Sequence, residues 1–400
     1  MREASRKTFM ENAQEKRLLS EFNLNLKYYF SEVLNKPLAK PYWIYISLSH
    51  QCNFNCQMCG VKKILRGQEL DFATLKKIFD EIASWKTDCV ITLTGGEPFL
   101  RKDIFEIIGY SASLGLRIEV VTNGSQIADR GIAKKILVSG LQNIAISLDG
   151  ASPLTHDYIR GVEGAYQKAL GALSYLCQEK KQAGCGPQIS VWSTIMKENI
   201  EELSEIIFLA KDQGVECLVY HPVIVTQEDM QNTIKTGHFW VTQAGLPELR
   251  RQIDKITDYQ KQSGLVAFLH DPYLWLDYFQ GTLAKKTWKC NPFVFIDIGP
   301  DGYVRSCGPA FGNVREMSLA ECLNTADAGK ARERMMRCQK PCLQTCWARP
   351  EADSLNAATD TFLSGLRGFA DNAAEKKEVL KYALESLVKY EDLILKGKLE

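Results

Sequence analysis

The feature that most constrains the fold is a regular alternation of short β-rich runs with longer helical segments between residues 43 and 224. The β-rich runs are apolar on both faces, as strands of a parallel sheet are when helices cover the sheet. Between them, apolar residues recur at helical spacing. The runs span 43–49, 89–95, 117–124, 143–150, 188–196 and 216–224. We therefore predict an α/β fold built on a partial (β/α)6 TIM-like barrel.

Polar and glycine-rich motifs collect where these predicted strands end. HQCNFNCQMCG follows the first strand, TGGEP ends the second, TNG ends the third and SLDG ends the fourth. In parallel α/β folds the reactive end is the one where strands lead into helices. The sequence therefore predicts a single functional site at the carboxyl ends of the strands.

Beyond residue 224 the periodicity changes, so we expect further segments around the barrel. Residues 225–285 are helical and aromatic-rich in pattern, and a cysteine-rich part contains the run FVFIDIGPDGYVRSC. Its PDG is typical of a hairpin turn, because Pro presets one torsion and Gly permits a positive one. The expected divisions are a helical lead-in (1–42), the barrel (43–224), a helical bridge (225–289), a small cysteine-rich domain (290–350) and a C-terminal helical segment (351–400).

Charge and hydropathy exclude two classes of partner. The chain has 49 Lys and Arg against 48 Asp and Glu, and this net charge of +1 gives no field to collect nucleic acid or an anionic membrane. No apolar run is long enough to span a bilayer, and the charged N-terminus lacks the apolar centre of a signal peptide. We expect a cytoplasmic protein with neither nucleic acid nor membrane as a partner.

Three cysteines stand close together after the first predicted strand, at Cys52, Cys56 and Cys59. In a reducing compartment the chain's 13 cysteines do not form a disulfide framework, which leaves metal ligation as the leading explanation for close groups. Three thiolates in a loop suit an iron–sulfur cluster whose fourth iron is open to another ligand. The alternative is a structural zinc ion, for which His50 is the nearest fourth ligand.

Together with GGEP and SLDG, the C-x3-C-x2-C loop resembles the signature of radical S-adenosylmethionine (SAM) enzymes. The resemblance covers residues 43 to about 224. It implies a [4Fe-4S] cluster on Cys52, Cys56 and Cys59, with SAM bound at the open iron. It also implies one-electron cleavage of SAM to a 5′-deoxyadenosyl radical, for which the protein supplies binding, orientation and exclusion of water.

The same resemblance implies which residues meet SAM. GGEP is similar to the motif that meets the methionine amino group, SLDG supplies a serine, and the arginine of HDYIRG approaches the carboxylate. Taken alone, each motif also has a structural interpretation as a turn, a helix start or a surface arginine. The expected SAM-binding residues are Gly95, Gly96, Glu97, Pro98, Asn123, Ser147 and Arg160.

A second group of cysteines lies beyond the barrel. Cys290 and Cys307 flank the predicted hairpin, and Cys338, Cys342 and Cys346 follow as a C-x3-C-x3-C run. This arrangement resembles the SPASM or Twitch extension of radical SAM enzymes. A full SPASM domain needs more than these five cysteines, so the resemblance implies one auxiliary [4Fe-4S] cluster in a Twitch-like domain. A structural zinc site is the alternative, since four thiolates also suit zinc.

The resemblance implies hydrogen abstraction from a peptide or small-molecule substrate, with the auxiliary cluster assisting electron transfer and an electron donor such as flavodoxin or ferredoxin. The alternatives are a dehydrogenase or tetrapyrrole-modifying radical SAM enzyme, and a non-catalytic zinc-binding scaffold. No catalytic acid or base is named, because hydrogen abstraction requires none. Tyr220 and His221 end the sixth predicted strand and are expected at the barrel mouth as substrate contacts. The aromatic segment His238 to Phe279 lines a substrate entrance or belongs to the core.

Overall fold

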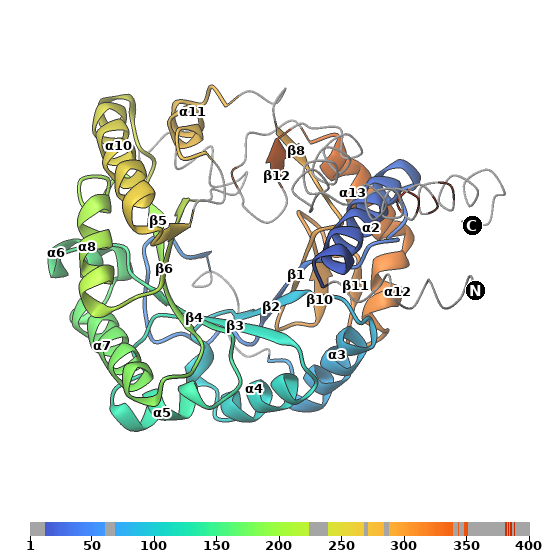
Figure 1. Cartoon of the computed structure of the whole chain (residues 1–400), viewed down its shortest axis with the longest axis horizontal. Helices are drawn as coiled ribbons and strands as arrows, with labels where there is room; N and C mark the ends of the chain where they lie inside the picture. The colour runs from blue at the N-terminus through green and yellow to red at the C-terminus, as the bar shows by residue number, and fades with distance from the viewer. Residues whose placement is uncertain are drawn as a thin grey trace.

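The sheet of the computed structural model is built mostly from parallel strands and bends into an open arc (Figure 1). The structure describes residues 13–60, 69–223, 239–267, 271–283, 288–338, 343 and 348–350, together with positions 381, 383, 385 and 388. Within this part the strand order is β11-β10-β9-β1-β2-β3-β4-β5-β6-β7. Helices α3, α4, α5, α7 and α8 lie along the outside of the arc (Figure 1).

The predicted (β/α)6 order is confirmed element by element. All pairings from β1 to β6 are parallel. The strands are β1 (Trp43–Ser47), β2 (Val90–Thr94), β3 (Arg117–Thr122), β4 (Asn143–Ser147), β5 (Gln188–Ile195) and β6 (Cys217–Pro222). The outer helices are α3 (Phe72–Ser84), α4 (Ile104–Ser113), α5 (Arg130–Leu137), α7 (Ala165–Ala183) and α8 (Leu203–Gln213).

The first outer helix shows why these segments become helices packed on the sheet. Its N-cap, Asp71, accepts a hydrogen bond from the backbone of Thr74, which satisfies a donor that the helix itself leaves unpaired. The buried side chains follow helical spacing and face the strands, where they join one continuous core with the sheet residues. They are Leu75, Ile78, Phe79 and Ile82.

Two short helical elements lie between the strands, and the sequence patterns missed the longer one. Helix α6 (Pro153–Arg160) follows β4, and the 3-10 helix η2 (Pro98–Leu100) follows β2. The signals for α6 were present, because Ser152 caps its start, Pro153 occupies its first turn and Gly161 ends it in a left-handed conformation. Eight residues are too few for a clear apolar periodicity, which is why the pattern missed it.

The predicted hairpin is present, and its place in the fold was not foreseen. β9 (Phe295–Ile298) and β10 (Tyr303–Arg305) pair antiparallel across a turn in which Gly302 has a φ of +85°. β9 also pairs in parallel with β1, so the hairpin and β11 (Gly312–Asn313) extend the barrel sheet beyond its first strand. At the other edge β7 (Val266–Ala267) extends it beyond β6.

The remaining described elements surround this sheet. Asn35, after α2, contacts Gly329 and Arg332 of α13, which fixes α2 against the hairpin side of the molecule. No helix in the described residues is long and apolar enough to cross a bilayer. The elements are α2 (Ala13–Leu34), η3 (Gln243–Gly245), α10 (Leu246–Ser263), α11 (Leu274–Gln280), β8 (Trp288–Cys290), α12 (Leu319–Asn324), α13 (Ala326–Met336) and β12 (Ala348–Pro350).

The C-terminal helical segment expected at 351–400 lies almost wholly outside the described residues. Its four described positions, Lys381, Ala383, Glu385 and Val388, are helical, and Ala383 is buried. The domain boundaries placed at 42, 224, 289 and 350 stay predictions. The sheet nevertheless crosses two of them, because β7 pairs with β6 across 224 and β9, which lies beyond 289, pairs with β1.

Candidate active site

A cavity of about 370 Å³ opens at the carboxyl ends of the barrel strands, where the sequence placed the site. Its walls come from the segments that follow β1 and β2, from the ends of β3 and β4, from α6 and from the ends of β5 and β6. The lining residues are His50, Cys52, Phe54, Cys56, Met58, Cys59, Thr94, Gly95, Gly96, Glu97, Val121, Thr122, Asn123, Ser147, Arg160, Thr194 and His221. Seven segments, spread from His50 to His221 along the sequence, therefore meet around one space.

All three cysteines of the first group line this cavity as thiols without a disulfide. Cys56 is buried, whereas Cys52 and Cys59 are half-buried. Burial raises the pKa of the Cys56 thiol, and the neighbouring Arg160 offsets part of that rise. Burial likewise raises the pKa of Cys52. A bound metal would have to supply the charge that keeps these sulfurs deprotonated.

The donor set fits an iron–sulfur cluster better than a single metal ion. Among the described residues, no three His, Cys, Asp or Glu side chains gather tightly enough to hold one ion. The three thiols instead line one cavity of about 370 Å³, which has room for a cluster and a small ligand. Each iron of a cluster takes one cysteine, so thiols spread around a cavity suit a cluster with one open corner.

GGEP holds the start of the cysteine loop through its backbone. The N–H of Gly96 donates to Ser49 O at 2.7 Å, and the N–H of Glu97 donates to Gln51 O at 2.7 Å. A Cβ on Gly96 would lie 1.9 Å from Gln51 O, so only glycine permits this approach. Pro98 begins η2, as the structural interpretation of the motif predicted.

The Glu97 carboxylate is 1% exposed and is bonded within the protein. Oε1 accepts from the N–H of Phe99 at 3.1 Å and from Thr122 Oγ1 at 2.6 Å, and Oε2 accepts from the N–H of Asn123 at 2.8 Å. Burial raises the pKa of Glu97, and these hydrogen bonds act in the opposite direction. Glu97 lines the cavity, but in this structure its bonds tie the end of β2 to the end of β3.

Asn123 and Ser147, both expected to bind SAM, line the same cavity. Asn123 Nδ2 donates to Asn53 Oδ1 at 3.0 Å, so the TNG turn is joined directly to the cysteine loop. Asn123 Oδ1 accepts from the N–H of Ser125 at 2.9 Å, a local bond typical of asparagine in turns. TNG thus has both its turn role and a place in the cavity wall.

Arg160 is buried at the end of α6, contrary to its interpretation as a surface arginine. Its Nη2 lies 2.6 Å from Asp149 Oδ2, and its Nη1 donates to Cys56 Sγ at 3.8 Å. Burial alone would lower the pKa of Arg160, but the carboxylate of Asp149 and the thiol of Cys56 raise it. The N–H groups of Asn55 and Gln57 donate to the carbonyls of Arg160 and Ile159, so α6 is hydrogen-bonded to the cysteine loop.

Asp149 is a candidate functional residue that the sequence analysis did not identify. SLDG was interpreted through its serine, yet its aspartate is fully buried and faces Arg160. An acidic residue directly after an apolar strand was the available signal, because a buried carboxylate needs a cationic partner. Thr122, the first residue of TNG, and Thr194 also line the cavity, and Thr194 had no signal beyond its place at a strand end.

Of the two residues expected at the barrel mouth from the sixth strand, one is there. His221 lines the cavity, with Nε2 3.2 Å from Thr194 Oγ1. Tyr220 is 2% exposed and its hydroxyl donates to Leu203 O, so it points outward to α8 and its predicted role as a substrate contact was wrong. Successive side chains of a strand face opposite sides, which explains the difference.

The described part of the aromatic segment belongs to the core. Trp275, Tyr278 and Phe279 of α11 are buried, and the ring of Trp240 packs on that of Tyr278 at 5.0 Å. The hydroxyl of Tyr278 donates to Val223 O at 3.0 Å. This outcome favours the core interpretation over a substrate entrance, while His238 lies outside the described residues.

The second group of cysteines is only partly described, because Cys342 and Cys346 lie outside the described residues. Cys290 ends β8 and packs beside Met335 and Phe295. Cys338 follows α13, and its N–H donates to the carbonyl of Met335. Cys307 follows β10, and its carbonyl accepts from Arg334 Nη2 at 2.7 Å. The end of α13 thus meets the segments that carry Cys290 and Cys307.

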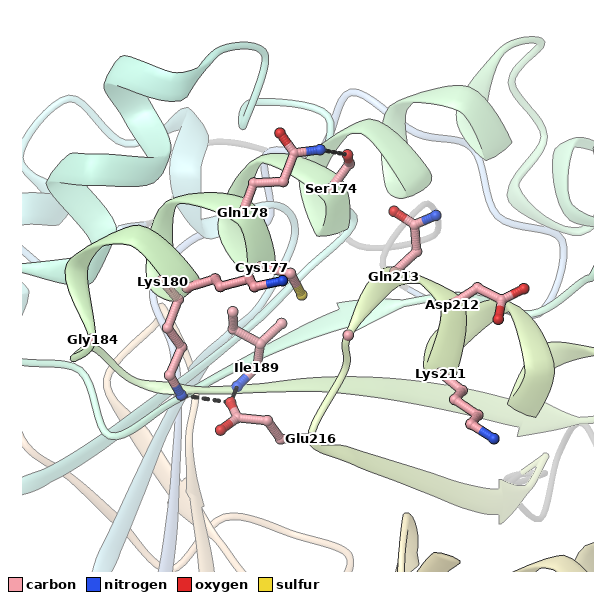
Figure 2. Close-up of a pocket in the computed structure, with 12 residues that line it drawn as sticks. Ser174, Cys177, Gln178, Lys180, Gly184, Ile189, Lys211, Asp212, Gln213 and Glu216 are labelled. Atoms are coloured by element: carbon pink, nitrogen blue, oxygen red, sulfur yellow. Dashed lines mark hydrogen bonds and ion pairs between the residues drawn. The ribbon is translucent and has the colours of Figure 1, made fainter.

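A second cavity, of about 710 Å³, lies outside the barrel between the C-terminal parts of α7 and α8 (Figure 2). Lys180 Nζ donates to Glu216 Oε2 at 2.6 Å across it. Cys177, the cysteine among its described lining residues, has a pKa raised to about 11 by burial. This cavity lies away from the reactive ends of the strands and has no group of thiols, so we do not assign chemistry to it.

Comparison with known proteins relates the barrel part of the chain to one superfamily. Residues 46–210 match the model of the radical SAM superfamily. An AdoMet-dependent heme synthase from Methanosarcina barkeri is 36% identical over 177 residues, which cover 44% of this chain and 48% of that protein. The matched part thus spans about half the length of that relative.

Two further proteins resemble more of the chain. A PqqA peptide cyclase from Methylocella silvestris is 25% identical over 332 residues, covering 77% of this chain and 81% of that protein. The structure of Streptococcus suis SuiB bound to S-adenosylmethionine has a TM-score of 0.58 at 15% identity, over 74% of this chain and 68% of that one. At this identity the structural likeness supports the partial-barrel fold and nothing further.

Proposed function

We propose that this chain, whose residues 46–210 match the model of the radical SAM superfamily, is an enzyme that cleaves SAM reductively in the cavity at the carboxyl ends of its strands. Cys52, Cys56 and Cys59 would hold a [4Fe-4S] cluster there. When bound, the cluster and SAM supply the one-electron cleavage that generates a 5′-deoxyadenosyl radical. The observation that carries the proposal is that all three thiols line one cavity with the GGEP, SLDG and Arg160 segments.

The residues of this chain would bind and orient SAM rather than exchange protons with it. We assign SAM contacts to Gly95, Gly96, Asn123, Ser147 and Arg160, which line the cavity beside the thiols. Arg160 brings the positive charge that a carboxylate requires. The glutamate and proline of GGEP, Glu97 and Pro98, are assigned mainly to holding the motif, since the Glu97 carboxylate already accepts three hydrogen bonds.

We propose a peptide as the substrate that receives the radical. The relative that matches the largest share of the chain among those described above is a peptide cyclase, and the match extends well beyond the barrel. His221 and Thr194 line the cavity on strands β5 and β6, where a substrate would meet bound SAM. Hydrogen abstraction from a peptide carbon would follow.

We further propose one auxiliary [4Fe-4S] cluster on four of Cys290, Cys307, Cys338, Cys342 and Cys346. Support comes from the sequence spacing and from the end of α13, which meets the segments of Cys290 and Cys307. Such a cluster would pass electrons between the substrate and an external donor such as flavodoxin or ferredoxin. Thiol ligands require a reducing compartment, so we place the protein in the cytoplasm.

The proposal is tested by anaerobic reconstitution with iron and sulfide, reduction with dithionite and chromatography of the products. We expect a brown protein with about eight irons per chain and SAM-dependent formation of 5′-deoxyadenosine. About two zinc ions in a colourless protein would instead support the scaffold alternative. An iron-loaded, reduced protein that forms no 5′-deoxyadenosine would overturn the proposed activity.

A second candidate substrate class is a tetrapyrrole, favoured by the 36% identity of the barrel segment to a heme synthase. That match covers 44% of this chain, whereas the peptide cyclase match covers 77%. Mass spectrometry separates the two classes. A mass change in a short peptide encoded beside this gene supports the peptide, and a changed iron porphyrin supports the tetrapyrrole.

A further inference from the structure

We propose that Asp149 is a positioning residue that holds Arg160 in the orientation needed to bind the carboxylate of SAM. The inference deepens the proposed function and rests on it. The central observation is a buried ion pair at the cavity wall, in which Arg160 Nη2 lies 2.6 Å from Asp149 Oδ2. Asp149 itself is not among the residues that line the cavity, so it would act through Arg160.

Asp149 is fixed independently of its arginine. Its Oδ1 accepts from the N–H of Thr194 at 2.7 Å, and its carbonyl accepts from Asn199 Nδ2 at 2.8 Å. Its N–H donates to Nδ1 of His156 at 3.1 Å. These bonds come from β5, from the segment before α8 and from α6, and they leave Oδ2 facing Arg160. The carboxylate is therefore oriented before any ligand arrives.

The backbone of α6, which carries Arg160, is also held in place by hydrogen bonds at both of its ends. Glu202 accepts hydrogen bonds from the N–H groups of Ala151 at 2.6 Å and Ser152 at 3.2 Å, and from the Ser152 hydroxyl at 2.9 Å. At the other end of the helix, the carbonyl of Arg160 accepts from Asn55 N in the cysteine loop. With the backbone held at both ends, the direction of the Arg160 side chain is decided by what its guanidinium meets.

One nitrogen of the Arg160 guanidinium has no hydrogen-bond partner among the described residues. Nη2 meets Asp149 and Nη1 meets Cys56 Sγ, whereas the buried Nε has no hydrogen-bond partner in the described residues. Arg160 is 8% exposed and lines the cavity. A buried N–H without a partner costs free energy, so the guanidinium does not have its full set of partners in this arrangement. Without Asp149, the charged partners left near the guanidinium would be Glu97 and the cysteines of the loop, and they would draw it away from this orientation.

The test compares SAM with decarboxylated SAM, which lacks the group that Arg160 would bind. Both are titrated anaerobically into reconstituted wild-type protein and Asp149→Asn, and dissociation constants are measured by equilibrium dialysis. Asparagine keeps an acceptor for Thr194 but removes the charge that holds Arg160. We expect the SAM dissociation constant to rise by roughly tenfold to a hundredfold, as for other residues that orient a binding group. Decarboxylated SAM should bind both proteins equally.

A double-mutant cycle separates positioning from general damage. In an Arg160→Gln background, Asp149→Asn should cause no further loss of SAM affinity, because its effect passes through Arg160. Asp88→Asn is the matched control, since Asp88 pairs with Arg117 at 3.0 Å on the surface, and it should leave both dissociation constants unchanged.

The other possible results distinguish a failure of the proposed function from a failure of the role assigned to Asp149. Wild-type protein that does not bind SAM would contradict the proposed function itself. If wild type binds SAM and Asp149→Asn binds it equally well, only the role of Asp149 is wrong. Loss of iron or of the circular dichroism spectrum in Asp149→Asn would show that Asp149 serves the fold, and equal weakening of both ligands would show the same; either result overturns the inference.

Discussion

The two cysteine-bearing regions differ in how the protein holds them. The first loop follows a central strand, and its backbone is hydrogen-bonded to GGEP on one side and to α6 on the other. In the second region, the described cysteines of the second group, Cys290, Cys307 and Cys338, come from three separate places: the end of β8, the segment after β10 and the segment after α13. The fold itself therefore organises the first loop from both sides, whereas the described cysteines of the second group come from separate elements that meet at the end of α13.

The largest expected effect is in the first region. Cys56→Ala should abolish SAM-dependent 5′-deoxyadenosine formation and lower the iron content by about four atoms per chain, because one cluster loses a ligand. Iron analysis and chromatography measure both. Cys185→Ala, at an exposed thiol, is the control and should change neither. Full activity in Cys56→Ala would contradict the assignment of the loop.

A more selective loss is expected in the second region. Cys307→Ala should also remove about four irons per chain, yet retain substrate-independent cleavage of SAM, because the first site is complete without it. Modification of the peptide should stop. The control in the same region is Cys322→Ala, since Cys322 is fully buried and burial raises its pKa to about 11, as expected for packing rather than ligation. If Cys307→Ala lost SAM cleavage to the same extent as Cys56→Ala, the two cysteine groups would not have the different roles proposed for them.

The claim that the first loop is held in advance is tested at Gly96. Gly96→Ala places a Cβ against Gln51 O and should lower the free energy of unfolding by about 1–3 kcal/mol, with reduced iron uptake. Gly109→Ala, at an exposed position inside α4 with open space around it, should raise the free energy of unfolding by about 0.5–1 kcal/mol. Denaturant titration compares the two. Equal effects would mean that the close approach at Gly96 is not a constraint.

The smallest expected effect is a loss of folding stability at acid pH, caused by His156, which accepts a hydrogen bond from the N–H of Asp149. Burial, aided by Arg160, lowers the pKa of His156 from 6.5 to about 3. As the pH falls, His156 binds a proton in the unfolded chain before it does so in the folded protein. The contribution of neutral His156 to folding stability is therefore complete above pH 6.5 and is lost as the pH falls toward 3. The slope is at most about 1.4 kcal/mol per pH unit.

Thermal unfolding of the reconstituted protein at about pH 7.5 and pH 5.5 measures this loss. His156→Asn keeps an acceptor for the N–H of Asp149 and does not titrate in this range, so it should lose about 1 kcal/mol less than wild type between the two conditions. An identical pH response in both proteins would show that His156 does not titrate on unfolding as proposed.

Much of the fold and the outline of the site could be predicted from local sequence patterns. Alternating β-rich and helical segments are short-range periodicities, and they identified all six barrel strands. The cysteine loop, GGEP and SLDG were recognisable because strand ends in a parallel sheet meet at one edge, and all three do line the cavity. α6 was missed because its eight residues carry signals at its ends and little periodicity between them.

The sequence by itself determined the order of strands and helices, the three thiols and their place at the reactive end of the barrel. Only the tertiary structure decided that β9 pairs with β1, that Tyr220 points away from the cavity, and that Asp149 faces Arg160. The physical reason is the range of the interactions. Periodicity and capping act within a few residues, whereas strand pairing, side-chain direction and buried ion pairs depend on segments that become neighbours only when the core is packed.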